Sequence, residues 1–512
     1  MRCGRRWIPR LAPIAGLFLA AVLFACGTHA RRDRPLRIAQ DLDILSLDPL
    51  SLEFSTVSAL SNVFEGLVGR DGEMRIQPAL AVRWATEREG RTWLFHLRSG
   101  VRFHDGSALT AAVVKEAFDR VRLDTESPGK QLLDNVASVE ATGDLVLRIT
   151  TVEPDPLLLQ RLVHLRVARG LTTREVVARH VGTGPYRLVS WEAPRRLVLE
   201  AFSEYWAGSP AVRHVELVDV APGEPRLDAI ARDQVDLAPL PQSVLDGSPP
   251  PSVTIVRGAG LRRMFLWVCG AERGPTSGPL GDARVRRAMA LALDRRAIAK
   301  ALTGDAEQGA VQLIPKGIFG SAANVAAESQ DVTAARRLLV EAGVPQGFEV
   351  PMMILDRGIA ERATASLVSG MLSKVGIRAT VRTIPRDEVM AAFDGRARGL
   401  LVSYWTFDDG DAGSFLRDCI HSRAGRPGRG LFNPGVSDGA LDRLIDDALT
   451  SISDDARSDR YREIMERTAQ TVPVVPLFDG VLTYGLAPGI HWKPRMDGFV
   501  LAADVMTAGP GL

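Results

Sequence analysis

Residues 95–106 of the chain read Phe95-His96-Leu97-Arg98-Ser99-Gly100-Val101-Arg102-Phe103-His104-Asp105-Gly106. Apolar and polar side chains alternate from Trp93 to Leu97 and again from Val101 to His104, with Gly100 between the two runs. A period of two is typical of strands, and an Asp-Gly pair is typical of a tight turn. The stretch therefore predicts two short strands that end at the turn formed by Asp105 and Gly106.

Helical spacing flanks such strand-like runs. Thr110 can cap a helix whose apolar residues share one face, namely Val114, Ala117, Phe118 and Val121. A second helical pattern comprises Val285, Ala288, Met289 and Ala292. Asp331 can cap a third helix, with Val332, Ala335, Leu338 and Leu339 inward, which Gly343 and Pro345 end. Further strands are expected at Leu145–Ile149, Leu197–Leu199 and Val215–Val218, so the chain is predicted to be a mixed α/β protein.

Length and charge limit the class of protein. A chain of 512 residues exceeds the roughly 250–300 residues at which single domains split, so we expect two or three domains. Hydrophobic residues make up 46% and charged residues 24%, which is typical of a globular chain. The 63 basic residues are scattered among 61 acidic ones, and this pattern excludes a concentrated nucleic-acid-binding face.

The first segment is predicted to be an export signal. Met1–Arg10 carries four arginines and no acid, and a 15-residue apolar run, Leu11–Ala25, follows it. At ~1.5 Å per residue such a run is shorter than the ~30 Å bilayer core. We therefore predict a signal peptide over residues 1–25 and a tether over residues 26–35. Its removal leaves 59 of the 63 basic residues and a mature charge near −2.

The end of this segment, Leu23-Phe24-Ala25-Cys26, resembles the lipobox of bacterial lipoproteins. The resemblance implies that Cys26 is acylated and becomes the mature N-terminus, so that the protein meets the membrane only through this lipid anchor. A plain signal peptide with an incidental cysteine is the alternative. Cys269 and Cys419 are the two cysteines beyond it, and they either pair or stay as separate buried thiols.

Motifs of catalysis are missing from the sequence. There is no nucleophile elbow, no His-Glu-x-x-His and no phosphate-binding loop of the Gly-x4-Gly-Lys type. The histidines are dispersed, so no metal site is predicted. The run Gly182-Thr183-Gly184-Pro185 is interpreted as the tight start of a strand, because proline lacks the N–H donor of a phosphate cradle. Adjacent carboxylates at Asp408-Asp409 and Asp446-Asp447 leave an exported hydrolase as one alternative.

Several further blocks follow one another in a recognisable order. They are Leu47–Pro49, Asn62–Val68, Pro78–Ala81, Phe95–Gly106, Gly182–Tyr186, Tyr205–Gly208, Val235–Leu237, Asp282–Ala288, Leu293–Arg295, Ala334–Gly343, Leu372–Ile377 and Trp405–Asp411. In type and order these blocks resemble the family 5 extracellular solute-binding proteins, the peptide- and nickel-type receptors of ABC importers. The resemblance covers nearly all of residues 36–500.

The resemblance implies an α/β fold of two hinged lobes, like that of type II periplasmic binding proteins, with an inserted subdomain. Lobe I would comprise residues 36–65, 182–262 and 480–512. Residues 66–181 would form the inserted subdomain of lobe I, and residues 263–479 would form lobe II. Two crossover strands would join the lobes.

It also implies a function. The protein would be the substrate-binding component of an ABC importer, capturing di- or oligopeptides outside the cytoplasmic membrane and delivering them to a permease served by an ATPase. We expect a monomer that is not an enzyme and that needs no cofactor. A receptor for a metal chelate or another small solute, and a ligand sensor without transport, are alternatives to the peptide receptor.

Peptide charges decide which residues should bind. Both charges of a zwitterionic peptide lose water when the lobes close, so each needs an opposite charge or several hydrogen bonds. In peptide-binding relatives the aspartate three residues after the loop tryptophan holds the ligand ammonium, and Asp408 occupies that position. A loop-capping carboxylate is the alternative. Arg357 is a candidate partner for the ligand carboxylate, or else one exposed arginine among many.

Two further segments are candidate parts of the site. Trp405 would either line the pocket or pack in the core beside Tyr404. The stretch after Leu47–Pro49 runs beside the ligand in relatives, which makes Glu53, Phe54 and Ser55 candidates. There the backbone could pair with an extended peptide as an added strand.

Overall fold

The computed structural model describes residues 34–40, 44–170, 177–242, 247, 249–270, 278–322, 325, 329–355, 358–393, 397–422 and 428–507. The expected signal peptide, Cys26 and Arg357 lie outside the described residues. Within them, no helix has both the length and the apolar composition that crossing a bilayer requires.

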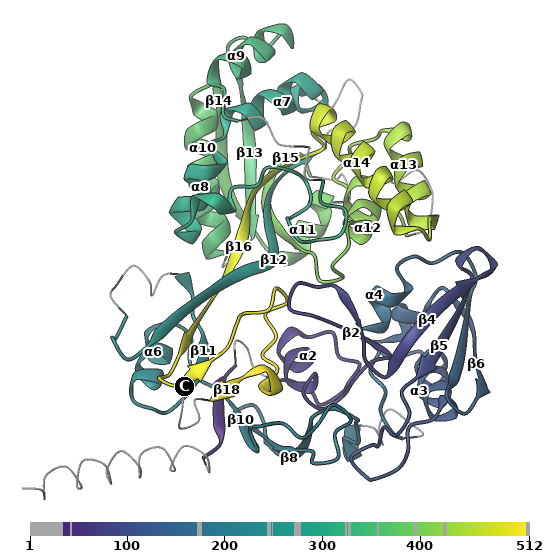
Figure 1. Ribbon diagram of the computed structural model, residues 1–512. Coiled ribbons are helices and arrows are strands. Elements are labelled where there is room, and N and C mark those ends of the chain that lie inside the picture. Colours follow the sequence, from purple (N-terminus) through teal and green to yellow (C-terminus); the bar gives the residue numbers. More distant parts are fainter. Residues whose placement is uncertain are drawn as a thin grey trace, which may run out of the picture.

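A ten-stranded sheet runs through the whole molecule. Its strands, in spatial order, are β14 (Ile377–Ile384), β13 (Phe348–Leu355), β15 (Gly399–Thr406), β12 (Thr254–Cys269), β16 (Val474–Leu486), β11 (Leu237–Pro239), β1 (Leu36–Ala39), β10 (His214–Val218), β9 (Arg196–Ala201) and β8 (Tyr186–Glu192). The long central strands β12 and β16 are antiparallel, and their register shifts between Ala259 and Arg263. Figure 1 shows these two strands running from the lower lobe into the upper one, as the resemblance implied.

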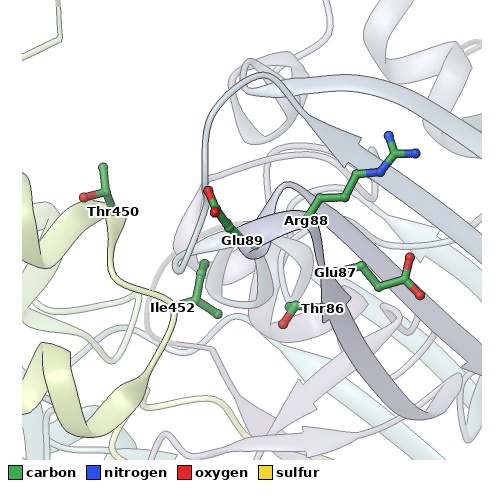
Figure 2. A pocket seen from close by; sticks show the side chains of 7 residues that line it. Thr86, Glu87, Arg88, Glu89, Thr450 and Ile452 are labelled. Atoms are coloured by element: carbon green, nitrogen blue, oxygen red, sulfur yellow. The ribbon is translucent and has the colours of Figure 1, made fainter.

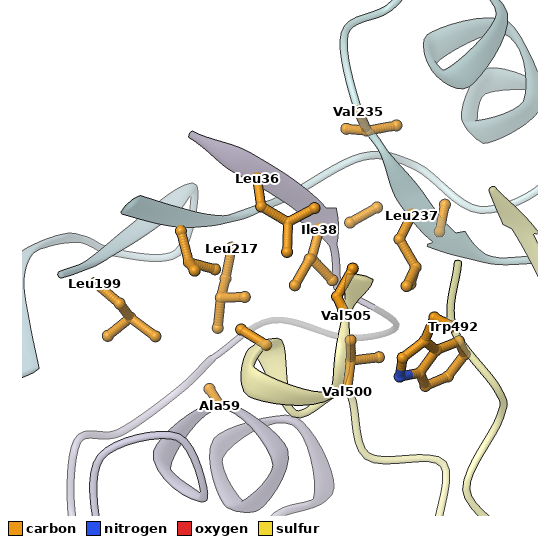
Figure 3. Packing of buried hydrophobic residues seen from close by; sticks show 14 of the residues in the cluster. Leu36, Ile38, Ala59, Leu199, Leu217, Val235, Leu237, Trp492, Val500 and Val505 are labelled. Atoms are coloured by element: carbon orange, nitrogen blue, oxygen red, sulfur yellow. The ribbon is translucent and has the colours of Figure 1, made fainter. Parts of the chain in front are cut away.

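The core changes along β12. Val253, Ile255 and Val256 join one hydrophobic cluster, whereas Met264 and Leu266 join another. Figure 3 shows how the first cluster brings distant segments together, since β1 packs there against the C-terminal residues that follow β16. Two lobes with separate cores therefore share one sheet.

Helices cover both faces of the upper part of the sheet. One face packs against α7 (Ala283–Ala292), α8 (Arg295–Thr303), α9 (Val332–Glu341) and α10 (Ile359–Ser373). The other packs against α11 (Arg386–Phe393), α12 (Ala412–Phe415), α13 (Gly439–Thr450) and α14 (Asp454–Thr471). Leu400 and Val402 of β15 belong to the cluster that packs against α7–α10, and Leu401 belongs to the cluster on the opposite face, as the period of two requires.

A smaller body packs beside the lower lobe and has its own core. It holds a four-stranded sheet of β4 (Ala81–Glu87), β5 (Thr92–Leu97), β7 (Val146–Thr151) and β6 (Val136–Gly143). The other elements of residues 66–170 are the hairpin β2 (Val68–Arg70) and β3 (Ile76–Pro78), the helices α3 (Ala111–Leu123) and α4 (Leu158–Leu162), and two short 3-10 helices, Arg88–Gly90 and Lys130–Leu133. Elsewhere in the lower lobe lie α2 (Phe54–Leu60), α6 (Glu224–Ala231), β17 (Ile490–His491) and β18 (Met506–Thr507).

Most local predictions are confirmed. Thr110 caps α3 by accepting from the Val113 N–H, and the four predicted inward residues of this helix are buried. Asp331 caps α9, and the predicted strands at 145–149, 197–199 and 215–218 coincide with β7, β9 and β10. Cys269 and Cys419 are buried and free, which confirms two separate thiols rather than a disulfide.

The second strand predicted in residues 101–104 is wrong. The backbone bonds there close a turn, with the Gly106 N–H donating to Phe103 O and the Phe103 N–H donating to Ser107 O, while the His104 N–H donates to Gly182 O. The β-type pairing of Arg102 is limited to an isolated bridge with Ala108. The alternating pattern reports burial of Val101 and Phe103, but a turn has used the donors that a strand would need.

The glycine-rich run precedes β8, as predicted, because two chain segments touch there. A Cβ atom at Gly182 would lie 2.1 Å from Val63 O, and one at Gly184 would lie 2.7 Å from the same oxygen. This closeness lets the Gly184 N–H donate to Val63 O at 2.9 Å. Only glycine permits such an approach of backbone to backbone.

Gly182→Ala should therefore destabilise the protein by about 2 kcal/mol or more, as overpacking against backbone does. Gly370→Ala is the matched control, since Gly370 lies in α10 with open space around its Cα and should gain up to about 1 kcal/mol. Urea unfolding midpoints measure both changes. A midpoint for Gly182→Ala equal to that of Gly370→Ala would contradict the close approach.

Candidate ligand-binding site between the lobes

The loop after β15 is held at its far end by a buried ion pair. Asp411 is fully buried, caps α12 by accepting from the Gly413 N–H at 2.8 Å, and pairs with Arg457 of α14. The Tyr461 hydroxyl donates to the other oxygen of Asp411 at 2.7 Å. Because removing one partner of a buried pair leaves an uncompensated charge, this anchor fixes the path of the loop.

Asp408 lies in the same loop, and its side chain is exposed. Within the described chain no cationic side chain forms an ion pair with its carboxylate. Solvent reaches the group, yet the protein around it is dense enough that desolvation raises its pKa, against the lowering effect of nearby Arg70 and of the loop's own backbone N–H groups. The position combines access to solvent with partial desolvation of the carboxylate.

Asp409 differs from its neighbour. Burial first, and then the carboxylates of Asp411 and Asp408, raise the pKa of Asp409 to about 7, while a hydrogen bond from Ser414 opposes the shift. Near neutral pH this side chain is protonated about half of the time. Asp411 is neutralised by Arg457, so Asp408 carries the least compensated negative charge of the three.

Trp405 packs mainly inside the upper lobe. Its ring meets Phe415 edge-on at 5.7 Å between centroids and Phe432 at 5.6 Å. Tyr404 is 41% exposed and lies under the Arg262 guanidinium rather than beside Trp405. The indole is half-buried, so a role as pocket wall stays a prediction.

The segment around α2 is arranged by a helix cap. The Glu53 carboxylate accepts from the Ser55 N–H at 3.0 Å and from the Thr56 N–H at 2.8 Å, so it serves the helix start. Ser55 is buried at 1% exposure. Phe54 is 37% exposed and packs against Phe499 at 5.6 Å. Of the three predicted residues, Phe54 offers the most surface to a ligand.

Arg70 was not singled out from the sequence, yet it links the smaller body to the loop after β15. It ends β2, and its guanidinium donates to the backbone oxygens of Asp408 and of Asp409, the latter at 2.7 Å. The same group donates to Gln160 O at 3.1 Å. The Asp71-Gly72 pair is the only local sequence signal, since it predicts a turn directly after Arg70.

A second junction lies at the edge of the lobes. Figure 2 shows Glu89 of the smaller body pointing toward Thr450 and Ile452 of the upper lobe, and these residues line a pocket of about 480 Å³ together with Thr86, Glu87 and Arg88. Ile452 comes so near to Gly90 that a Cβ there would lie 2.1 Å from the isoleucine side chain. The pocket holds no grouping of catalytic side chains. Within the described residues no three histidine, cysteine or acidic side chains are placed to hold a metal ion.

Of the adjacent carboxylates at 446–447, that of Asp446 has structural partners. Asp446 accepts from Arg429 Nε at 3.1 Å and lies 3.5 Å from His421 Nε2. The Asp447 carbonyl oxygen accepts from the Ser451 N–H at the end of α13. Neither position resembles a pair of carboxylates that face each other across a substrate.

Comparison with known proteins places this geometry in a family. The model of the bacterial extracellular solute-binding proteins, family 5, matches residues 75–426. The glutathione-binding protein GsiB of Shigella flexneri serotype 5b is 25% identical over 485 residues, covering 91% of this chain and 92% of GsiB.

Solved structures share the fold. HbpA2 from Haemophilus parasuis superimposes with a TM-score of 0.81 at 19% identity, covering 93% of this chain and 100% of HbpA2. The periplasmic binding protein DppA from Helicobacter pylori, solved with the peptide STSA, gives 0.70 at 22% identity over 93% of this chain and 98% of DppA. The two-lobed fold, the shared sheet and the matched length agree, and the chain belongs to the bacterial extracellular solute-binding proteins of family 5.

Proposed function

We propose that this protein captures peptides outside the cytoplasmic membrane and delivers them to an ABC importer made of a permease and an ATPase. The observation that carries the proposal is the Asp408 carboxylate, which has no ion pair among the described residues and lies in the loop at the junction of the lobes. The peptide bound to DppA and the ligand named for GsiB support the same class of solute.

The role of Asp408 is to neutralise the peptide ammonium. A buried ammonium needs an opposite charge, and a charge-assisted hydrogen bond is worth about 1.5–3 kcal/mol. Asp411 and Asp409 are less suited, because one is paired with Arg457 and the other is half-protonated near pH 7. Phe54 and Phe499 add apolar surface from the lower lobe. Transport also requires release, so closure need shift the open–closed balance by only a few kcal/mol.

The division of the chain is part of the proposal. Residues 36–65, 182–262 and 480–512 form lobe I, residues 66–181 its inserted subdomain, and residues 263–479 lobe II. The separate hydrophobic clusters support this division, since β12 leaves one cluster after Val256 and joins the others from Leu261 onward. A monomer suffices for such a receptor, because one chain supplies both lobes.

A chelate receptor, a sensor and a hydrolase remain as alternatives to peptide capture. Native mass spectrometry of freshly purified protein separates them. We expect a bound peptide that is released intact on denaturation. A metal-containing adduct would instead favour the chelate receptor. Conversion of added peptides into fragments would contradict the receptor and favour an enzyme.

Asp408→Asn should weaken peptide binding by more than about 1.5 kcal/mol, since the amide cannot neutralise an ammonium. Calorimetric titration with a peptide identified by mass spectrometry measures the change. Asp228→Asn in α6 is the control, because Asp228 is exposed and its ion-pair partner among the described residues is Arg232, which directly follows that helix. An unchanged dissociation constant for Asp408→Asn would remove this residue from the site.

We also propose that Cys26 carries the lipid anchor, so that the protein stays tethered to the membrane. Cys26→Ser should abolish globomycin-sensitive processing and release the protein from the membrane fraction. Fractionation and immunoblotting of cells that express either form measure the outcome. Identical fractionation of the variant and the wild type would rule out the anchor.

A further inference from the structure

The hairpin of residues 68–78, which we call the latch hairpin, lies between the two lobes. It comprises β2, β3 and the turn that joins them, and Figure 1 shows β2 at the junction of the lower and upper parts. The hairpin emerges from the smaller body, where Val68 is buried in the cluster of β4 and β5. Its contacts therefore connect elements that are otherwise far apart in the chain.

The lower lobe grips one side of the latch hairpin. Arg495, in the segment after β17, donates through Nη2 to Arg70 O at 3.1 Å and to Asp71 O at 3.2 Å. The Met496 N–H donates to Gly72 O at 2.9 Å. These bonds use backbone oxygens of the turn, so they hold the hairpin in one orientation relative to the lower lobe.

The turn of the latch hairpin reaches into the core of the upper lobe. Met74 is 4% exposed and belongs to the cluster of Phe407 and Phe415 rather than to that of its own body. Its φ of 69° is left-handed, which is uncommon for a residue other than glycine. Gly410 lies against it, since a Cβ at Gly410 would be 3.2 Å from that of Met74 and 3.1 Å from Met74 O.

Arg70 adds the polar half of this contact. One guanidinium nitrogen donates to Asp408 O and the other to Asp409 O. One rigid group therefore fixes two consecutive peptide units of the loop after β15. Nη1 also lies 3.4 Å from His164 Nε2. Burial first, and then the charges of Arg70 and Arg166, lower the pKa of His164 to about 3, so the imidazole is neutral and can accept from Arg70.

We propose that the latch hairpin ties the two lobes together in the arrangement described here and that Arg70 is a positioning residue for the Asp408 carboxylate. Opening the lobes must break both bonds from Arg70 to the loop and withdraw Met74 from the upper core. The bonds from Arg70 go to the backbone oxygens of Asp408 and Asp409, so they orient the loop independently of the side chains at these two positions. Its positive charge also offsets the three neighbouring carboxylates until a ligand cation arrives. The role of Asp408 in this scheme rests on the proposed function, whereas the latch itself does not.

Small-angle scattering of the ligand-free protein tests the latch. Arg70→Met and Met74→Ala should each raise the radius of gyration above that of the wild type, because the open form becomes more populated. Arg83→Met is the control, since Arg83 is an exposed arginine of the same small body and the one hydrogen bond of its side chain among the described residues is with His96. Profiles of both variants that coincide with the wild type would overturn the latch, and Met74→Ala decides alone if Arg70→Met does not fold.

A double-mutant cycle tests the positioning role. Asp408→Asn should weaken peptide binding more than tenfold in the wild type but less than threefold in Arg70→Met, because the loop is already misplaced there. Arg70→Lys keeps the positive charge but loses the forked donor. Its affinity for the peptide should lie between those of the wild type and of Arg70→Met, mainly because the peptide dissociates faster than from the wild type. The positioning role would be overturned if Asp408→Asn weakened binding equally in the wild type and in Arg70→Met, or if Arg70→Lys bound the peptide as tightly as the wild type. A wild type that binds no peptide refutes the proposed function, while the scattering result still decides the latch.

Discussion

The antiparallel pairing of β12 with β16 is the constraint on which the rest of the structure depends. These two strands are the part of the sheet common to both lobes, and their register shift between Ala259 and Arg263 lies where the hydrophobic core changes from one cluster to another. Two cores joined by hydrogen-bonded strands can move relative to each other without either core losing its packing. A fold of this kind can enclose a solute and release it again, because the moving parts stay intact.

Charge at the junction of the lobes is distributed unequally, and this inequality gives the loop its chemistry. Asp411 forms an ion pair with Arg457 and accepts a hydrogen bond from Tyr461. Asp409 is half-protonated near neutral pH, and Asp408 stays accessible. Three aspartates within four residues would repel one another if all were ionised and unpaired. Pairing one and partly protonating another leaves Asp408 as the exposed carboxylate of the three that has no ion pair among the described residues.

Local structure was largely predictable, and the departures have a common cause. The cap at Thr110 and the helix after Asp331 follow from short-range chemistry, whereas the close approach of Gly182 to Val63 depends on the tertiary fold. The strand expected at 101–104 does not form, because a turn and the Gly182 carbonyl take its backbone bonds. Glu53 caps a helix and Trp405 packs in an aromatic cluster. The contacts that place both side chains are with neighbours that a pattern of residue types does not reveal.

The sequence by itself determined the family, the α/β class, the order of the elements and the loop that holds Asp408, because motifs and periodicities are written in neighbouring residues. Only the tertiary structure decided which of the three aspartates stays exposed and without an ion pair among the described residues, and that Arg70, 338 residues before Asp408, fixes the loop from the opposite side. Pairing, burial and hydrogen bonds between distant segments depend on how the sheet brings them together. No local pattern around Arg70 specifies those partners.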